Sequence, residues 1–155
     1  MASWCITGLN LAEDRRSPLA PNSENSTREV MRGDESCAFV AIVEDDIHVL
    51  RSMDRLLRAA GCRTQSFTSA EEFLGQLNLN MFSCVVLDVS LQGMNGLELQ
   101  GRLSRSHSTV PIVFVTAVDL EEVKAAALQA GAIAYLPKPV NEGDLLKAIH
   151  SALGE

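Results

Sequence analysis

The chain has 155 residues, with a hydrophobic content of 46%, a charged content of 21% and a formal net charge of −7. This composition predicts one globular domain with a real core, and the negative charge excludes a protein that holds nucleic acid or anionic membrane through broad basic patches. No apolar run approaches the roughly 20 residues of a membrane-spanning helix, and no basic segment precedes an apolar one as in a signal peptide. The four cysteines lack metal-binding spacing, so we expect reduced thiols and a cytoplasmic location.

Residues 1–37 differ in composition from the rest of the chain. The segment is polar, contains Pro18 and Pro21, and has no sustained hydrophobic period. Such a segment cannot bury enough apolar surface to offset the entropy lost on ordering it. We therefore expect residues 1–37 to be a disordered extension and residues 38–155 to be the folded domain.

From Phe39 onward, short apolar runs alternate with segments of helical periodicity. The apolar runs predict strands, and apolar positions that recur every three or four residues predict helices. Ser69, in a capping box with Glu72, and Asn141 predict two helix starts. The expected elements are strands near 39–43, 62–67, 84–87, 111–116 and 133–136, and helices near 49–60, 69–77, 97–103, 119–130 and 141–153.

Five strands that alternate with five helices indicate an α/β fold. Parallel strands need crossover connections, and right-handed crossovers place helices on both faces of the sheet. The sequence therefore predicts a doubly wound five-stranded parallel sheet. The carboxyl ends of its strands gather at one edge, which is where such folds bind ligands.

Asp88 ends the buried run after Cys84 and precedes a loop with two glycines. Two interpretations are open for this residue alone: it is placed for chemistry at the sheet edge, or it caps the following loop or helix. Polar residues end three other strands in the same way, and their complementary chemistry favours a site. They are Glu44 and Asp45 (with Asp46, more readily a helix cap), Thr116, and Lys138.

Several carboxylates at one edge indicate a cation site. Two like charges about 4 Å apart repel by about 4 kcal/mol at an effective dielectric constant near 20. A cluster therefore raises a pKa or binds a cation, and oxygen ligands suit Mg²⁺ or Mn²⁺. An aspartate flanked by a divalent ion and Lys138 can attack a phosphoryl group and become an aspartyl phosphate. The Thr116 hydroxyl and the Lys138 ammonium would then contact phosphoryl oxygens.

Four motifs carry these residues, and together they resemble the receiver domain of two-component response regulators over roughly residues 39–153. The matching stretches are IVEDD, VVLDVSLQGMNGLEL, PIVFVTA and AYLPKP. The resemblance implies a flavodoxin-like (βα)5 fold and a signalling switch that accepts a phosphoryl group from a sensor histidine kinase or a phosphotransfer protein. Such a domain catalyses its own phosphorylation and dephosphorylation but turns over no external metabolite, so we do not expect an enzyme.

The resemblance also assigns roles around the acids. Asp88 would be the phosphoacceptor. Glu44 and Asp45 would be the acidic pair that holds the metal together with Asp88, and the carbonyl of Ser90 would be a further, main-chain ligand. The cofactor implied is Mg²⁺ or Mn²⁺.

Roles in the switch follow from the same resemblance. Thr116 would be the switch hydroxyl and Lys138 the lysine that contacts the phosphoryl group, preceding Pro139 in a cis bond. Tyr135 matches the aromatic switch position, and the less favoured alternative is a simple core aromatic. Phosphorylation would alter the face formed by the fourth helix, the fifth strand and the fifth helix, where a downstream protein or a second copy would bind.

One position departs from the family pattern: Gln92 stands where proline usually precedes the glycine. Proline would stiffen this loop, so its rigidity, and to a smaller degree the metal affinity, are in question. Two other functions stay open. An aspartate-nucleophile phosphatase needs a second acid two residues after the nucleophile, where this chain has Ser90. A receiver-like interaction module that is never phosphorylated would have no use for this set of acids, Thr116 and Lys138.

No output domain is visible after the last predicted helix, and no basic recognition helix is present, so we expect no direct contact with nucleic acid. The sequence is compatible with a stand-alone receiver and with a piece of a longer regulator. No membrane association is expected. The three histidines, His48, His107 and His150, lie on helical patterns or in a loop and are expected at the surface.

Overall fold

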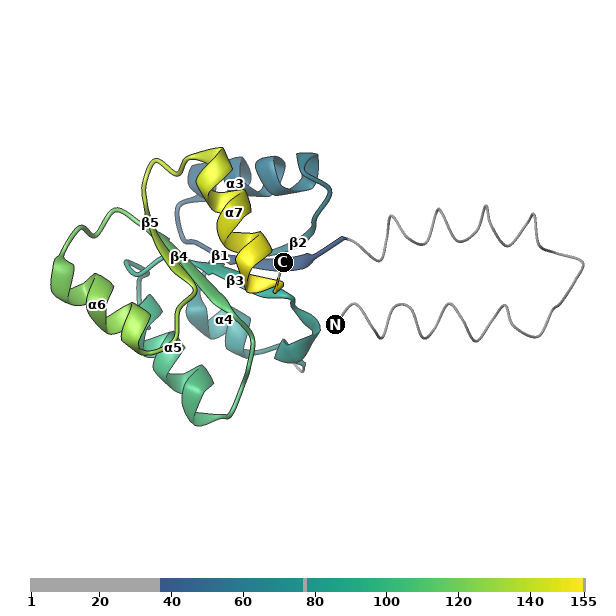
Figure 1. Ribbon diagram of the computed structural model, residues 1–155. Coiled ribbons are helices and arrows are strands. Elements are labelled where there is room, and N and C mark those ends of the chain that lie inside the picture. Colours follow the sequence, from purple (N-terminus) through teal and green to yellow (C-terminus); the bar gives the residue numbers. More distant parts are fainter. Residues whose placement is uncertain (1–36, 77, 155) are drawn as a thin grey trace, which may run out of the picture. The chain divides into compact units, whose positions relative to one another are not determined.

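The computed structural model describes residues 37–76 and 78–154 (Figure 1). Residues from Phe39 onward form one compact unit. The expected disordered extension over residues 1–37 falls, apart from Cys37, outside the described residues and stays a prediction.

One five-stranded sheet organises the domain, with the strand order β2-β1-β3-β4-β5 and parallel pairing throughout. This is the flavodoxin-like order, so the predicted doubly wound parallel sheet is confirmed. β3 and β4 are buried along their whole length, whereas the edge strands are partly exposed, as expected for a sheet covered on both faces. The strands are β1 Phe39–Val43, β2 Arg63–Phe67, β3 Cys84–Leu87, β4 Ile112–Thr116 and β5 Ala134–Pro137.

Helices cover both faces of the sheet. Figure 1 shows α3 and α7 on one face and α4, α5 and α6 on the other. A core cluster on the second face joins alternate residues of β1, β3 and β4 to Phe73, Leu99 and Ala127 of those three helices. Among residues 37–76 and 78–154, none of the helices combines the length and the hydrophobicity that a membrane span requires. The helices are α3 Ile47–Ala59, α4 Ala70–Leu74, α5 Gly96–Arg105, α6 Glu121–Gln129, α7 Glu142–Ala152 and the 3₁₀ turn η2 Leu79–Met81.

Helix ends follow the capping residues of the sequence in most places. The side chains of Asp46 and Asn141 accept hydrogen bonds from the first turns of α3 and α7, as expected. α6 is different, because it begins after Leu120 with no side-chain cap. α4 ends at Leu74, earlier than predicted, because glycine at position 75 gives little support to a further turn.

The predicted capping box at Ser69 is only half correct. Ser69 Oγ accepts from the Glu72 N–H at 3.0 Å, but the Glu72 carboxylate accepts from the Thr68 N–H at 2.7 Å instead of from Ser69. A complete reciprocal box lies elsewhere, between Asn95 and Glu98 at the start of α5. This second box directly follows the loop after Asp88, so it fixes the far end of that loop.

Two buried side chains away from the sheet edge have clear structural roles. Gln100 of α5 is buried, and its Nε2 donates to the Ala127 carbonyl of α6 at 3.0 Å, which joins the two helices. A buried amide requires such a partner. Cys84 is buried in β3, and burial raises the pKa of its thiol to about 12, so the reactive thiolate form is rare at neutral pH.

Candidate functional site

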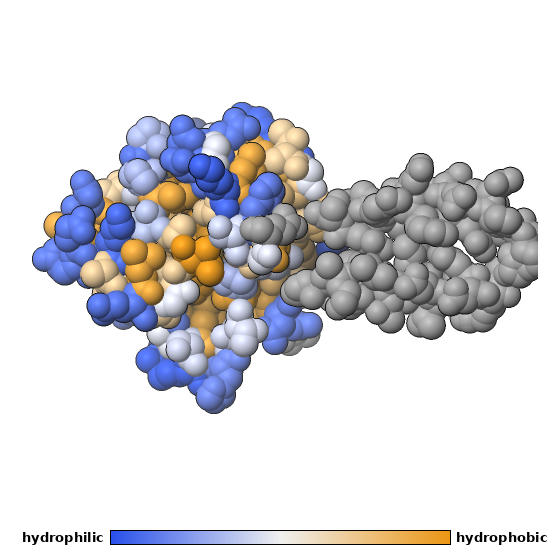
Figure 2. Space-filling model, in the orientation of Figure 1, coloured by the Kyte–Doolittle hydropathy of each residue, from blue (hydrophilic) through white to orange (hydrophobic). Residues whose placement is uncertain are grey.

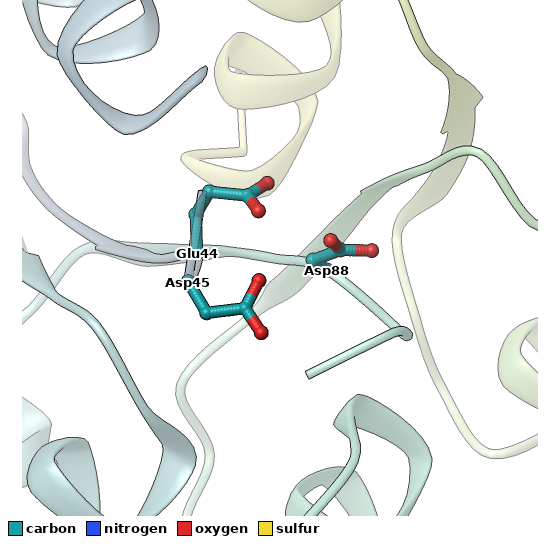
Figure 3. A group of neighbouring side chains, drawn as sticks. All are labelled: Glu44, Asp45 and Asp88. Carbon is teal, nitrogen blue, oxygen red and sulfur yellow. The ribbon is translucent and has the colours of Figure 1, made fainter. Parts of the chain in front are cut away.

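The acids meet because two neighbouring strands end side by side. The Glu44 N–H donates to the Phe67 carbonyl at 3.0 Å, and the Asp88 N–H donates to the Val43 carbonyl at 3.2 Å, so the sheet hydrogen bonding continues past β1 and β3. One carboxylate oxygen from each of Glu44, Asp45 and Asp88 lies within 4.8 Å of the other two. Figure 3 shows the Glu44 and Asp45 side chains extending from the end of β1 beside Asp88. The predicted acid cluster is therefore assembled by the fold.

Lys138 neutralises part of this cluster. Glu44 is 1% exposed and Asp88 is 4% exposed, and a buried charge is tolerated only with a compensating partner. Lys138 Nζ lies 2.7 Å from Glu44 Oε1 and 2.9 Å from Asp88 Oδ2. The lysine follows β5 at the other end of the sheet order, and its long side chain spans β4 to reach both acids. The expected cis Lys138–Pro139 bond is present.

The pKa values reflect this shared cation. Burial raises the pKa of Glu44, against the opposing effect of Lys138, because desolvation disfavours its charged form. Burial by itself would lower the pKa of Lys138, but its contacts with Glu44 and Asp88 outweigh burial and raise it. Lys138 is therefore firmly protonated as long as the two acids carry charge.

Asp46 lies next to the acid pair but serves the helix. Its carboxylate accepts from the N–H groups of His48 and Val49, and its own N–H donates to Glu44 Oε2 at 3.1 Å. The expectation that Asp46 is a cap is confirmed. It also holds Glu44 through the main chain, so the start of α3 orients one of the site acids.

The loop after β3 contacts three carboxylates through alternate main-chain N–H groups. The Ser90 N–H donates to Asp88 Oδ1 at 3.0 Å, and the Gln92 N–H donates to Asp45 Oδ2 at 3.1 Å. The Met94 N–H donates to Glu71 Oε2 of α4 at 2.9 Å. The metal-ligand role expected for the Ser90 carbonyl stays a prediction, whereas its N–H has a definite place in the site.

Two residues that fix this loop were not identified from the sequence: Gly96 at its end and Glu71 in α4. A Cβ at Gly96 would lie 2.3 Å from the Asp88 carbonyl oxygen, so only glycine fits beside the end of β3. Glu71 holds the loop from outside, and its carboxylate would lie 2.9 Å from a Cβ at Gly93. The Asn95-Gly96 pair at the start of a helix is a sequence pattern that could have pointed to the glycine. No sequence pattern could have predicted the hydrogen bond between Glu71 and Met94, because the two residues lie far apart in the chain.

Thr116 and Tyr135 meet at the main chain of Val118. Thr116, 1% exposed at the end of β4, accepts from the Val118 N–H at 3.2 Å. The Tyr135 hydroxyl donates to the Val118 carbonyl at 2.8 Å. The Thr116 hydroxyl thus contacts the following loop rather than Asp88 in this structure. Burial, with the nearby Asp119 and Asp88 charges, raises the pKa of Tyr135, so the phenol stays a donor.

The donor set fits Mg²⁺ or Mn²⁺. Three carboxylates face one ammonium group, which leaves negative charge for a cation to neutralise. Buried Glu44 Oε1 has Lys138 Nζ as its partner at 2.7 Å, and that same ammonium group is shared with Asp88. All the candidate ligand atoms are oxygens, as hard divalent ions prefer. His48, His107 and His150 are exposed, as expected, and lie outside the cluster.

Comparisons with known proteins agree on one family. The family profile of the response regulator receiver domain matches residues 40–150. Nodulation protein W of Bradyrhizobium diazoefficiens is 38% identical over 115 residues, which cover 74% of this chain and 51% of that protein. Response regulator protein TmoT of Ectopseudomonas mendocina is 36% identical over 126 residues, which cover 81% of this chain and 56% of the relative.

Solved structures give the same result. The crystal structure of a response regulator receiver protein from Burkholderia phymatum superimposes with a TM-score of 0.66 at 42% sequence identity. The match covers 76% of this chain and 95% of that structure. By contrast, this chain spans only about half the length of the curated relatives it matches.

Proposed function

The chain belongs to the receiver domains of two-component response regulators, and on that premise we propose that it is a signalling switch set by phosphorylation of Asp88. The observation that carries the proposal is the position of the Asp88 carboxylate. It lies 2.9 Å from Lys138 Nζ and within 4.8 Å of two further acids. A carboxylate so placed can act as a nucleophile toward phosphorus, with a cation ready to neutralise the charge that the phosphoryl group brings.

The proposed donor is a phosphohistidine on a sensor histidine kinase or a phosphotransfer protein. An oxygen of Asp88 forms the new P–O bond while the P–N bond breaks and its electron pair stays on the imidazole. Lys138 neutralises charge on the phosphoryl oxygens throughout. Water later hydrolyses the acyl phosphate and regenerates the free carboxylate, so the domain turns over only its own modification and no external metabolite.

The acid cluster would hold the cofactor. Glu44, Asp45 and Asp88, with the Ser90 carbonyl, would bind Mg²⁺ or Mn²⁺, which supplies the positive charge that lets an anionic donor approach three acids. Lys138 can then exchange its contact with Glu44 for one with the phosphoryl group, because both positions are within reach of its flexible stem.

The effect of Asp88 phosphorylation would be transmitted to the protein surface through Thr116 and Tyr135. New phosphoryl oxygens on Asp88 would accept a hydrogen bond from the Thr116 hydroxyl, and a turn toward them would draw the hydroxyl oxygen away from the Val118 N–H that it now accepts from. Once Thr116 turns toward them, the 116–118 loop can shift, and the Tyr135 hydroxyl loses its fixed acceptor. The ring can then turn toward the space left by Thr116. This is a local change of charge and packing that biases a two-state element.

The surface that this change would alter is formed by α6, β5 and α7. Figure 2 shows apolar side chains gathered in the middle of this face and hydrophilic ones around them. The exposed large hydrophobic residues include Leu120, Leu128 and Ile133, all on or next to α6 and β5. We propose that a downstream protein or a second copy of the chain docks here. We propose that residues 38–155 contact neither nucleic acid nor a membrane directly. We also propose that the protein is located in the cytoplasm beside the kinase.

The test is phosphorylation in the presence of Mg²⁺, with a small phosphodonor or a cognate kinase. The parent protein should gain the mass of one phosphoryl group as an acid-stable, base-labile acyl phosphate. Asp88→Asn should gain none. Asp46→Asn is the matched control, because asparagine caps a helix as well as aspartate and Asp46 lies outside the acid cluster. Equal labelling of the parent and Asp88→Asn would refute the assignment.

A further inference from the structure

The departure at position 92 gives the site a hydrogen-bond donor that proline would remove. The Gln92 N–H donates to Asp45 Oδ2 at 3.1 Å. Proline has no N–H group, so the residue usual at this position could not make this bond. The Gln92 side chain is exposed, and only its main chain takes part. The substitution therefore matters for what it does to the backbone.

The bond is one of a regular series. The N–H groups of residues 90, 92 and 94 donate to Asp88, which follows β3, to Asp45, which follows β1, and to Glu71 of α4. Between them, Leu91 is buried and anchors the loop in the core. The loop thus holds two of the site acids at once. Only the central bond, to Asp45, depends on position 92 not being proline.

We propose that the main-chain N–H of Gln92 is a positioning group for Asp45 and thereby strengthens divalent-cation binding at the acid cluster. The inference rests on the proposed function, since it takes the cluster to be the Mg²⁺ site. Asp45 lies in the loop after β1 and is more exposed than Glu44 or Asp88. Its carboxylate would otherwise turn freely, and a cation would have to immobilise it.

The bond leaves ligand capacity on Asp45. A carboxylate has about four lone-pair positions, and one N–H donor on Oδ2 leaves the other oxygen open. Because the side chain is oriented in advance, less conformational entropy is lost when the ion binds. The bond also connects the segment of Glu44 and Asp45 after β1 to the loop that contains Ser90. The proposed metal ligands of these two segments are therefore held at fixed positions relative to one another.

The experiment compares the parent with Q92A and Q92P. Q92A removes the side chain but keeps the N–H, whereas Q92P removes the donor. Mg²⁺ is titrated into each protein and followed by amide chemical shifts, with Asp45→Ala as the reference for complete loss of this ligand. We expect Q92A to bind like the parent. Q92P should bind about 3- to 10-fold more weakly, below the typical 10- to 100-fold effect of outer-shell groups because this bond is exposed.

Several outcomes are decisive. If Q92P and Q92A bind Mg²⁺ equally, the inference is wrong, while phosphorylation of Asp88 is unaffected by that result. If the parent binds no more tightly than Asp45→Ala, the proposed metal site fails as well. A melting temperature of Q92P close to that of the parent excludes simple loop damage. As a measurement that needs no substitution, the Gln92 amide of the metal-free parent should exchange with solvent more slowly than that of Gly93, and equal rates would also overturn the inference.

Discussion

The two sides of the site are held very differently. The acid side, residues 44–46 and 88–96, is fixed by hydrogen bonds from the main chain to Glu44, Asp45 and Asp88 and by the capping box that follows. The switch side, residues 116–120 with Tyr135, has two side-chain hydrogen bonds to the main chain of Val118, and the helix that follows, α6, starts without a side-chain cap. The chemical groups are thus positioned in advance, whereas the segment proposed to move is held by few contacts that can be exchanged.

This difference assigns separate tasks to separate parts of one sheet edge. Preorganised acids lower the cost of binding an ion and of orienting Asp88. A helix whose start is weakly held can change position for a small free energy, which we propose the phosphoryl group supplies. Substitutions on the first side should therefore change stability and metal binding strongly, whereas those on the second side should change coupling and have only small effects on stability.

The largest expected effect is on the acid side. Gly96→Ala should lower the free energy of unfolding by about 3 kcal/mol, because its Cβ would overlap the Asp88 carbonyl and force the strand end to shift. Urea unfolding measures the change. Gly101→Ala in the same helix is the control, since the added Cβ would meet only the Arg105 side chain, at 3.5 Å. This substitution should stabilise α5 by up to about 1 kcal/mol, because alanine loses less backbone entropy in a helix than glycine. Equal stability of Gly96→Ala and the parent would mean that the strand end is not rigid.

An intermediate effect is expected at the junction of the two sides. Thr116→Ala should remove the acceptor of the Val118 N–H and cost about 1 kcal/mol of stability, while Asp88 is still phosphorylated. Addition of beryllofluoride, a phosphoryl mimic, should then shift the amides of residues 118–149 much less than in the parent. Thr116→Ser keeps the hydroxyl and should respond normally. A full response in Thr116→Ala would disprove coupling through this residue.

The smallest expected effect is on the switch side. Leu120→Ser should provide the cap that α6 lacks and raise the free energy of unfolding by about 0.5 to 1 kcal/mol. Leu120→Ala removes the same exposed side chain without adding a cap, so the difference between the two variants isolates the capping bond. Thermal or urea unfolding gives both values. If Leu120→Ser is no more stable than Leu120→Ala, the main-chain N–H groups in the first turn of α6 already have other hydrogen-bond acceptors.

The sequence predicted the parts of the site that depend on strand order. Glu44, Asp45, Asp88 and Lys138 each follow an apolar run, and parallel pairing is enough to bring strand ends together. The family profile over residues 40–150 agrees with the resemblance read from four motifs.

What the sequence could not predict depends on the path of individual loops. The bond from Met94 to Glu71 and the close approach of Gly96 to Asp88 depend on backbone positions that no local pattern encodes. The Glu72 carboxylate failed to complete its box for a similar reason, because the backbone offered it the Thr68 N–H instead. The sequence pattern indicates only that Gln92 removes the stiffness of proline, and the donor that its N–H provides to Asp45 depends on the path of the loop.

The buried bond from Gln100 to the Ala127 carbonyl gives α6 a pivot. It grips the helix near its last turn, far from the uncapped start at Leu120. Leu120 lies seven residues before Ala127, about 10 Å along the helix axis, so a tilt of about ten degrees about the pivot would carry the start of the helix by about 2 Å. The end that would move most is the one next to the Thr116 loop. A helix held in this way would act as a lever, and it would enlarge the displacement that we propose at the strand end into one that a partner protein can bind differently.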